Sequence, residues 1–171
     1  MKYFFLLTFI YTIAFSNILN INSFEADFKQ EIKDEKGKVL LYSGHVISIK
    51  PKSALWSYTS PVKKSIYIVD NTVTIVEPEI EQVIVKHISS EYDFFNLIKN
   101  AKEIQKNKYL TIFKEQKYII TLRDFKLFSI SYTDEFDNDT LITFSKQEQN
   151  KNINKNLFLP SFPQEFDLIQ E

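Results

Sequence analysis

The feature that most constrains this chain is a succession of short apolar runs, each ended by a proline, a glycine or a charged turn. Residues 44–56 show the pattern, because a run rich in β-branched residues at 46–49 is followed by Pro51 and then by a second run that holds Trp56. β-Branched side chains fit a pleated surface, and proline cannot donate to a ladder of strand hydrogen bonds. The stretch therefore predicts a strand, a break and a second strand.

Strict alternation marks residues 23–32, where apolar side chains occupy one parity and charged side chains mostly occupy the other. A period of two is typical of a half-buried strand. Gly37 suits the turn that follows, Gly44 suits a bulge or bend, and residues 70–71 (Asp-Asn) predict a two-residue hairpin. About ten strands are expected on this basis, at residues 23–32, 39–50, 54–59, 65–69, 72–76, 81–88, 109–113, 117–122, 127–132 and 140–144.

The hydrophobic period changes once, after residue 90. Ser90 followed three residues later by Asp93 forms a capping box that starts a helix. Lysines lie late in the segment, the last of them Lys106. Positive charge is stabilised there by the negative C-terminal end of the helix dipole. A single helix cannot supply the crossovers of a parallel sheet, so the chain predicts a mainly β sandwich or barrel whose helix covers one face or mouth of a curved antiparallel sheet. The apolar residues at helical spacing are Phe94, Leu97, Ile98, Ala101 and Ile104.

The N-terminus has the pattern of an export signal. Lys2 precedes an uncharged apolar run at residues 3–15, and Ala14-Phe15-Ser16 places small residues at the −3 and −1 positions of a cleavage site. The run is shorter than the roughly 20 residues that a membrane-spanning helix needs. We therefore expect a signal peptide over residues 1–16, cleaved near Ser16, and a single domain over residues 17–171.

Composition excludes several classes of protein. The chain has no cysteine, which excludes a disulfide framework, a thiolate nucleophile and a lipid-acceptor cysteine after the signal. The formal net charge is −1, and the lysines are dispersed rather than interleaved with aromatics in a basic block. Neither feature is typical of a nucleic-acid-binding protein, so no nucleic-acid partner is expected.

Few residues are candidates for catalysis or metal binding. The only histidines, His45 and His87, lie among β-branched residues with no His, Asp or Glu nearby at ligand spacing, so we expect ordinary sheet histidines. The acidic loop at residues 134–139 offers oxygen ligands for a hard cation, but it lacks the ligand spacing of an EF-hand and is more typical of a solvated turn. No Gly-x-Ser-x-Gly elbow is present, and no nucleophile–base pair is visible.

Several expected strands are apolar on both parities, as at residues 83–85 and 118–120. One explanation is a core on one face, with a helix or loops over the other. The alternative is a sheet that lines a hydrophobic cavity, with the apolar face of the helix as its lid.

A set of short motifs resembles the periplasmic outer-membrane lipoprotein carrier proteins, the LolA family. Residues 24–30 (Phe-Glu-Ala-Asp-Phe-Lys-Gln) are similar to the Phe-x-Ala-x-Phe-x-Gln opening of that family. The resemblance spans nearly the whole mature chain, and the order and spacing of the motifs carry it. The other matching positions are Gly44, Lys50-Pro51, Trp56, Val69-Asp70, Pro78, Glu81-Gln82, the apolar helix at 94–98, the hairpin at 137–144, and the C-terminal Phe158, Pro163, Phe166 and Leu168.

The resemblance implies an unclosed antiparallel β-barrel (half-barrel) with a helical lid over an apolar cavity that holds the acyl chains of lipoproteins. It implies a periplasmic monomer without cofactor, metal or enzymatic activity. Its partners would be an inner-membrane ABC lipoprotein release complex and either an outer-membrane acceptor or the outer membrane itself. We expect the cavity to be lined by Phe28, Val46, Trp56, Val83, Val85, Phe94, Leu97 and Ile98.

Three departures from the family pattern are visible. Lys50 stands where the family often has an arginine that ties the lid to the barrel, so we expect a weaker lid latch at this position, since lysine is a flexible point charge. Residues 17–22 leave room for only a short N-terminal helix, and the segment between the central helix and the late hairpin is short. A lipid-sensing or structural envelope module with the same half-barrel remains an alternative to a shuttling carrier.

Overall fold

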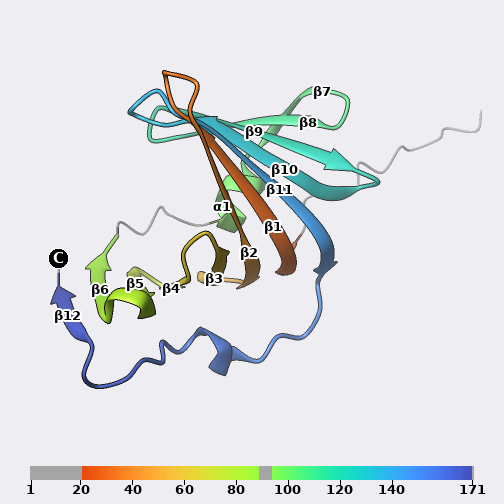
Figure 1. Ribbon diagram of the computed structural model, residues 1–171. Coiled ribbons are helices and arrows are strands. Elements are labelled where there is room, and N and C mark those ends of the chain that lie inside the picture. The colour runs from red at the N-terminus through yellow and green to blue at the C-terminus, as the bar shows by residue number, and fades with distance from the viewer. Residues whose placement is uncertain (1–20, 89–93, 171) are drawn as a thin grey trace, which may run out of the picture.

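The computed structural model describes residues 21–88 and 94–170, which fold around one twelve-stranded sheet (Figure 1). Within these ranges, one α-helix and two 3-10 helices accompany the strands. The strands are β1 (Ser23–Lys33), β2 (Val39–Ile49), β3 (Ser53–Ser60), β4 (Lys64–Val69), β5 (Thr72–Glu77), β6 (Gln82–His87), β7 (Lys102–Gln105), β8 (Lys108–Phe113), β9 (Gln116–Arg123), β10 (Lys126–Thr133), β11 (Asp139–Gln149) and β12 (Asp167–Gln170). The helices are α1 (Phe94–Lys99), η1 (Pro78–Ile80) and η2 (Lys155–Phe158).

The sheet is unclosed. Its strand order is β12-β6-β5-β4-β3-β2-β1-β11-β10-β9-β8-β7, so β12 and β7 are the two edges within the described residues. Strands adjacent in sequence pair antiparallel from β1 to β6 and from β7 to β11, and β11 returns to pair with β1. None of the helices in the described ranges is long and apolar enough to cross a membrane.

Local sequence signals explain most of these strands. The alternating residues predicted as the first strand form β1, and the Asp70-Asn71 hairpin joins β4 to β5 as expected. Gly37 adopts a φ of +80° in the turn between β1 and β2, a conformation that glycine adopts without steric cost. The register between β2 and β3 shifts next to Gly44, which confirms the predicted bulge.

The expectation of about ten strands is wrong, because β7 and β12 were not predicted. β7 occupies part of the expected helix, since α1 ends at Lys99 and the backbone from Lys102 onward pairs with β8. A backbone hydrogen bond from Ala101 to Ile98 closes the helix. The expected capping box lies outside the described residues. Helix α1 thus ends earlier than the helix that the sequence predicted, whose apolar spacing continues to Ile104.

The prediction that all strands pair antiparallel is wrong at one edge of the sheet. β12 pairs with β6 in parallel, with Ile169 opposite Ile84. The segment before β12 carries η2, which contacts β3 and β4, and it runs alongside these strands before the chain joins the edge (Figure 1). Phe158 in η2 is only 3% exposed, so this segment has an apolar contact of its own with the sheet.

The two faces of the sheet differ in chemistry. We call the face that carries Phe28 the inner face, and helix α1 packs on this side through Phe95 and Ile98. The opposite, outer face carries the charged side chains of β1, which alternate with its apolar ones. The buried cluster on the inner face consists of Ile21, Phe24, Ala26, Phe28, Val46, Phe95, Ile98, Ile120, Leu122, Leu127, Ile130 and Phe144.

Candidate functional site

A row of apolar side chains crosses the inner face from β2 to the β12 edge. Trp56 in β3 lies opposite Ile66 in β4 in the antiparallel ladder, and the pairing continues strand by strand. Paired residues present their side chains on the same face, so these residues form one continuous line. All except Val46 are only half-buried, which leaves an apolar strip open to a ligand. The members, called the apolar row below, are Val46, Trp56, Ile66, Ile75, Ile84 and Ile169.

Aromatic rings extend the apolar row toward the centre of the sheet. The ring centroid of Phe28 lies 5.0 Å from that of Trp56, and the centroid of Phe144 lies 6.4 Å from Trp56. Phe24 contacts Phe144 edge to face, with centroids 5.2 Å apart. Such tilted pairs add to the burial of apolar area. The apolar row therefore begins at a wall of aromatic rings.

Helix α1 covers the other part of the inner face. Phe95 is 4% exposed and Ile98 is 1% exposed. Phe94 contacts Phe24 with ring centroids 5.6 Å apart, and Leu97 packs partly against the same cluster. The helix thus contributes apolar side chains to the face that carries the apolar row.

The structure brings together six of the eight predicted cavity residues. Phe28, Val46, Trp56, Phe94, Leu97 and Ile98 belong to the inner-face cluster or pack against it. Val83 and Val85 do not, since the ladder pairs Ile84 with the Trp56 line and alternation turns its two neighbours to the outer face. Placing Val83 and Val85 in one cavity with Trp56 was therefore wrong. Ile84 takes their place.

The sequence missed Ile66, Ile75 and Ile84. Residues 83–85 are all β-branched, so the local pattern does not say which of them faces the core. Only the register with Trp56, carried through two intervening strands, assigns the face.

Lys50 lies at the end of β2, next to helix α1. Its ammonium donates to the side-chain Oδ1 of Asn22 at 3.0 Å and lies 5.8 Å from the centroid of the Phe95 ring. The sequence predicts a weak latch between lid and barrel at this position, and the structure places Lys50 against an aromatic ring of α1.

The outer face carries a charged cluster around His45. Its Nδ1 lies 2.9 Å from Asp27 and its Nε2 lies 3.1 Å from Glu25, because both carboxylates project from the neighbouring strand β1. These carboxylates are distant from His45 in sequence and adjacent to it in register, so the spacing along the chain did not reveal them. Hydrogen bonds from Lys151, and secondarily from His45, lower the pKa of Glu25, and the His45 hydrogen bond, followed by that of Lys146, lowers the pKa of Asp27.

This cluster is a set of ion pairs and does not converge on one point. The two ring nitrogens of His45 point at different carboxylates. Over residues 21–88 and 94–170, no group of three or more metal-ligating side chains is arranged to hold an ion. In the acidic loop, Asp134 instead accepts hydrogen bonds from the backbone of Phe136 and Asn138, which makes it a turn cap.

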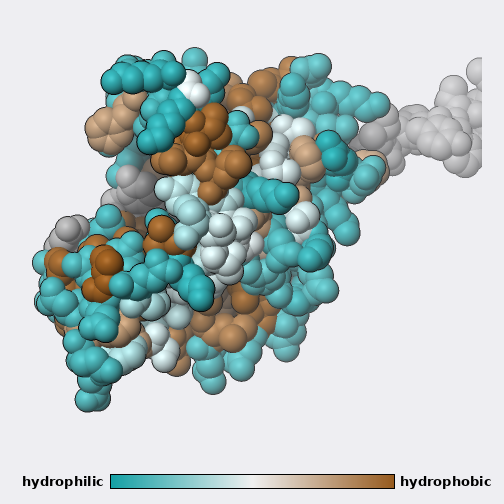
Figure 2. All heavy atoms as spheres, viewed as in Figure 1, coloured by the Kyte–Doolittle hydropathy of each residue, from teal (hydrophilic) through white to brown (hydrophobic). Residues whose placement is uncertain are grey.

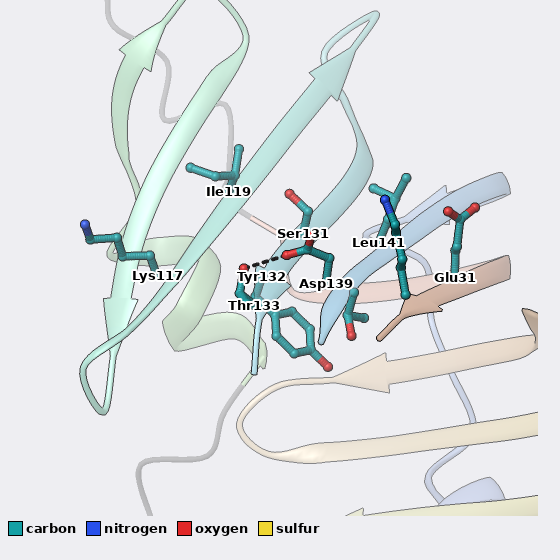
Figure 3. A pocket seen from close by; sticks show the side chains of 10 residues that line it. Glu31, Lys117, Ile119, Ser131, Tyr132, Thr133, Asp139 and Leu141 are labelled. Atoms are coloured by element: carbon teal, nitrogen blue, oxygen red, sulfur yellow. Dashed lines mark hydrogen bonds between the residues drawn. The ribbon is translucent and has the colours of Figure 1, made fainter. Parts of the chain in front are cut away.

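Two adjoining grooves lie mainly on the outer face. The larger, of about 530 Å³, is drawn in Figure 3, where Ile119, Ser131 and Leu141 point to one side of the strands and Tyr132 points to the other. The second, of about 390 Å³, shares Glu31 and Leu141 with it. Neither groove was predicted from the sequence.

The surface beside these grooves is partly apolar. Figure 2 shows hydrophobic side chains near the top of the view, below the hairpin tips. At the start of β2, Val39 and Leu40 are each 44% exposed and Leu41 is 65% exposed.

An unclosed sheet with an accessible apolar row and a helix against the same face defines a half-barrel protein suited to binding apolar ligands. Residues 19–161 match the family described as outer membrane lipoprotein carrier protein LolA, and the chain belongs to this family.

Two relatives illustrate the match. A Campylobacter jejuni subsp. jejuni protein named outer-membrane lipoprotein carrier protein is 40% identical over 171 residues, covering 99% of this chain and 100% of that protein. A protein of the same name from Wolinella succinogenes is 35% identical over 161 residues, covering 93% of each chain.

Solved structures share the fold at low identity. An uncharacterized conserved protein from Thermus thermophilus superposes with a TM-score of 0.56 at 8% identity, covering 90% of this chain and 93% of its own. A LolA superfamily protein from Nitrosomonas europaea gives 0.50 at 9% identity, covering 82% and 91%. This likeness concerns the fold alone.

Proposed function

We propose that this protein is a periplasmic carrier that binds the acyl chains of lipoproteins leaving the inner membrane and delivers them to the outer membrane. The observation that carries the proposal is the apolar row on the inner face of a chain that belongs to the lipoprotein carrier family. The relatives at 40% and 35% identity bear the name of this function.

The acyl chains bind along the apolar row, against the aromatic wall formed by Phe28, Trp56 and Phe144. The energy available is the transfer of apolar surface out of water, about 0.8 kcal/mol for each buried methylene. A bilayer offers a similar gain, so the net change on moving a chain between membrane and carrier is small. The direction of transfer is then set by the partners at each membrane rather than by the carrier.

Helix α1 is the mobile cover of the inner face, and Lys50 is the latch that holds it through Phe95. The donor is an inner-membrane ABC lipoprotein release complex, and the recipient is an outer-membrane acceptor or the outer membrane itself. The carrier works as a monomer without a cofactor, after a signal peptide is cleaved near Ser16.

The test is transfer with purified components. The mature chain is incubated with inner-membrane vesicles that hold a labelled triacylated lipoprotein and the release complex. Acquisition is measured as label that elutes with the soluble carrier in a one-to-one complex. Delivery is measured as label that then moves to outer-membrane vesicles. Acquisition without delivery would support the lipid-sensing alternative, and no acquisition would contradict the proposal.

A further inference from the structure

The inner face becomes polar one row away from the apolar row. Tyr58 and Lys64 are paired in the ladder directly beside the pair of Trp56 and Ile66. Successive side chains on one face of a strand are about 7 Å apart, so an acyl chain that lies against Trp56 ends within reach of this polar pair. Tyr58 also contacts Phe28, with ring centroids 5.0 Å apart, so the two regions are continuous.

Three tyrosines gather at this polar end. Tyr42 lies against Tyr58 with ring centroids 5.9 Å apart. Tyr132 points to this face, away from the outer-face residues of the groove (Figure 3). Burial, together with the nearby phenols of Tyr132 and Tyr42, raises the pKa of Tyr58 to about 12. Tyr58 therefore stays protonated, and its hydroxyl donates to Oε1 of Gln30 at 3.0 Å.

Lys64 is a half-buried cation held by aromatic rings. Its ammonium lies 4.8 Å from the ring centroid of Tyr58 and 5.8 Å from that of Tyr42. Within the described part of the chain it has no ion pair with a carboxylate. Aromatic rings attract an ammonium through their faces, so they hold it in place while its N–H groups can still donate hydrogen bonds to a ligand.

Two further donors lie on the neighbouring strands β1 and β2. Gln30 is only 9% exposed, and Tyr58 occupies its carbonyl oxygen, which leaves the amide nitrogen as the remaining polar group. In residues 21–88 and 94–170, neither this nitrogen nor the hydroxyl of Tyr42 has a hydrogen-bond partner. No fully buried side-chain atom there is left without a partner, so both atoms are at least partly accessible. The ladder pairs Gln30 with Tyr42, which places the two groups side by side.

We propose that Lys64, Tyr42 and Gln30 form a recognition site for the ester carbonyls at the polar end of acyl chains bound along the apolar row. The proposal rests on the lipoprotein-carrier function and adds the groups that orient the cargo. Carbonyl oxygens of acyl esters only accept hydrogen bonds, and each free group at this site can donate one. The chains then lie with their carbonyls at Tyr58 and their methyl ends toward Ile84.

A free phospholipid carries the same ester carbonyls next to a phosphate. A phosphate is usually met by several cations or by a forked guanidinium. This site offers a single ammonium between rings, which fits neutral carbonyls better than an anion.

The test uses the full mature chain and two synthetic probes. One is a cysteinyl peptide with two ester-linked and one amide-linked palmitoyl chains, and the other replaces the two esters by ethers. The variants are Lys64→Met, which keeps the apolar stem, and Tyr42→Phe, which removes one hydroxyl. Lys63→Met, at an exposed neighbouring lysine, is the matched control. Affinity is measured by displacement of a fluorescent fatty acid, and thermal unfolding verifies that each variant folds.

We expect Lys64→Met and Tyr42→Phe each to weaken binding of the ester probe about three- to tenfold, the range expected for one lost hydrogen bond. Binding of the ether probe should change less than about twofold, and Lys63→Met should match the wild type with both. If the wild type and all variants bind the ester probe with equal affinity, the proposed recognition site is wrong, but the carrier function is unaffected.

Two other results separate the remaining possibilities. If Lys64→Met weakens binding of phosphatidylglycerol more than binding of the ester probe, the site selects a phosphate and the proposal is wrong. If the wild type binds neither lipopeptide, the carrier function itself fails, and the site fails with it.

Discussion

The ammonium of Lys50 lies 5.8 Å from the ring centroid of Phe95, so the end of strand β2 contacts helix α1. Lys50 also donates to Asn22, which immediately precedes β1. One side chain thus connects the start of the sheet to the helix that covers it. Because Lys50 is exposed, this connection is weak, which is consistent with the proposed role of α1 as a mobile cover.

Lys50→Leu should slow delivery more than acquisition. An exposed cation–π contact is worth about 0.5–1 kcal/mol, so its loss should shift the equilibrium from the docked to the open helix by roughly two- to fivefold. The added apolar surface favours the open, liganded state, and release of cargo should weaken by a similar factor. Lys50→Arg should preserve delivery. Transfer of a labelled lipoprotein to acceptor vesicles measures this, and a wild-type rate for Lys50→Leu would show that Lys50 is an ordinary surface lysine.

Ile84→Ala should mainly weaken cargo binding, whereas Val83→Ala should mainly lower the stability of the fold. Ile84 belongs to the half-buried apolar row, so its truncation should weaken cargo binding about five- to tenfold, with a small loss of stability. Val83 is 0% exposed and faces the outer side, so its truncation should cost about 2 kcal/mol of folding free energy and leave affinity unchanged. Lipopeptide titration and denaturant unfolding of both variants separate the faces. Weaker cargo binding in Val83→Ala alone would contradict the assignment.

The sequence predicts those strands whose own side chains alternate between apolar and charged residues, because the alternation shows which face is buried. Residues 23–32 alternate strictly and form β1 as predicted. β7 has no such signal, because all four of its side chains are exposed and its strand conformation depends on pairing with β8. β12 is likewise short and depends on β6.

The residues of the candidate site were also predictable only where a local pattern marks them. Phe28 and Trp56 follow from alternation and from the family motif, and both lie on the inner face. The choice between Val83 and Ile84 depends on a register carried through two other strands, which no local pattern contains. The carboxylates around His45 were missed for the same reason, since they lie across the ladder rather than along the chain.

Gly44→Ala should be strongly destabilising. A Cβ at this position would lie 2.1 Å from the carbonyl oxygen of Ser57 and 2.9 Å from the Phe28 ring, so the backbone of β3 must move. We expect a loss of about 3 kcal/mol, the upper range for overpacking in a core. Gly37→Ala is the control, since its Cβ meets nothing within 4 Å and only the positive φ costs about 1 kcal/mol. Thermal unfolding of both variants measures the difference, and equal losses would exclude the close approach at Gly44.

The ion pairs of Glu25 and Asp27 should make stability fall in acid. Both carboxyl groups have a lowered pKa in the folded protein, Glu25 from 4.5 and Asp27 from 3.8. A lowered carboxyl pKa stabilises the fold above the unfolded value, and this contribution is lost as the pH falls through the folded value. Lys151→Met removes the largest cause of the Glu25 shift. Its melting temperature should therefore lie below that of the wild type at neutral pH and converge with it at about pH 3.

Lys63→Met serves as the control for this comparison, because Lys63 is exposed and has no ion pair within the described residues. It should follow the wild-type melting curve at every pH. A gap between Lys151→Met and the wild type that stays constant down to about pH 3 would mean that Lys151 acts by packing rather than by its charge.

Trp56 should report occupancy of the inner face. It is the only tryptophan in the chain, and it is half-buried beside Phe28, with ring centroids 5.0 Å apart. An acyl chain along the apolar row would displace water from the exposed part of the indole, so emission should shift to shorter wavelength and saturate with the lipopeptide. Ile66→Ala, next to Trp56 in the ladder, should weaken the affinity but reach the same final emission.

Brominated acyl chains extend this measurement to the direction of the bound chain. Bromine quenches an indole only on close approach, and Trp56 lies one row from the polar pair of Tyr58 and Lys64. A chain brominated near its carbonyl should therefore quench Trp56 more strongly than a chain brominated at its methyl end. The reverse order would mean that the chain runs in the opposite direction along the apolar row. Saturable binding with unaltered emission would place the acyl chains away from Trp56 altogether.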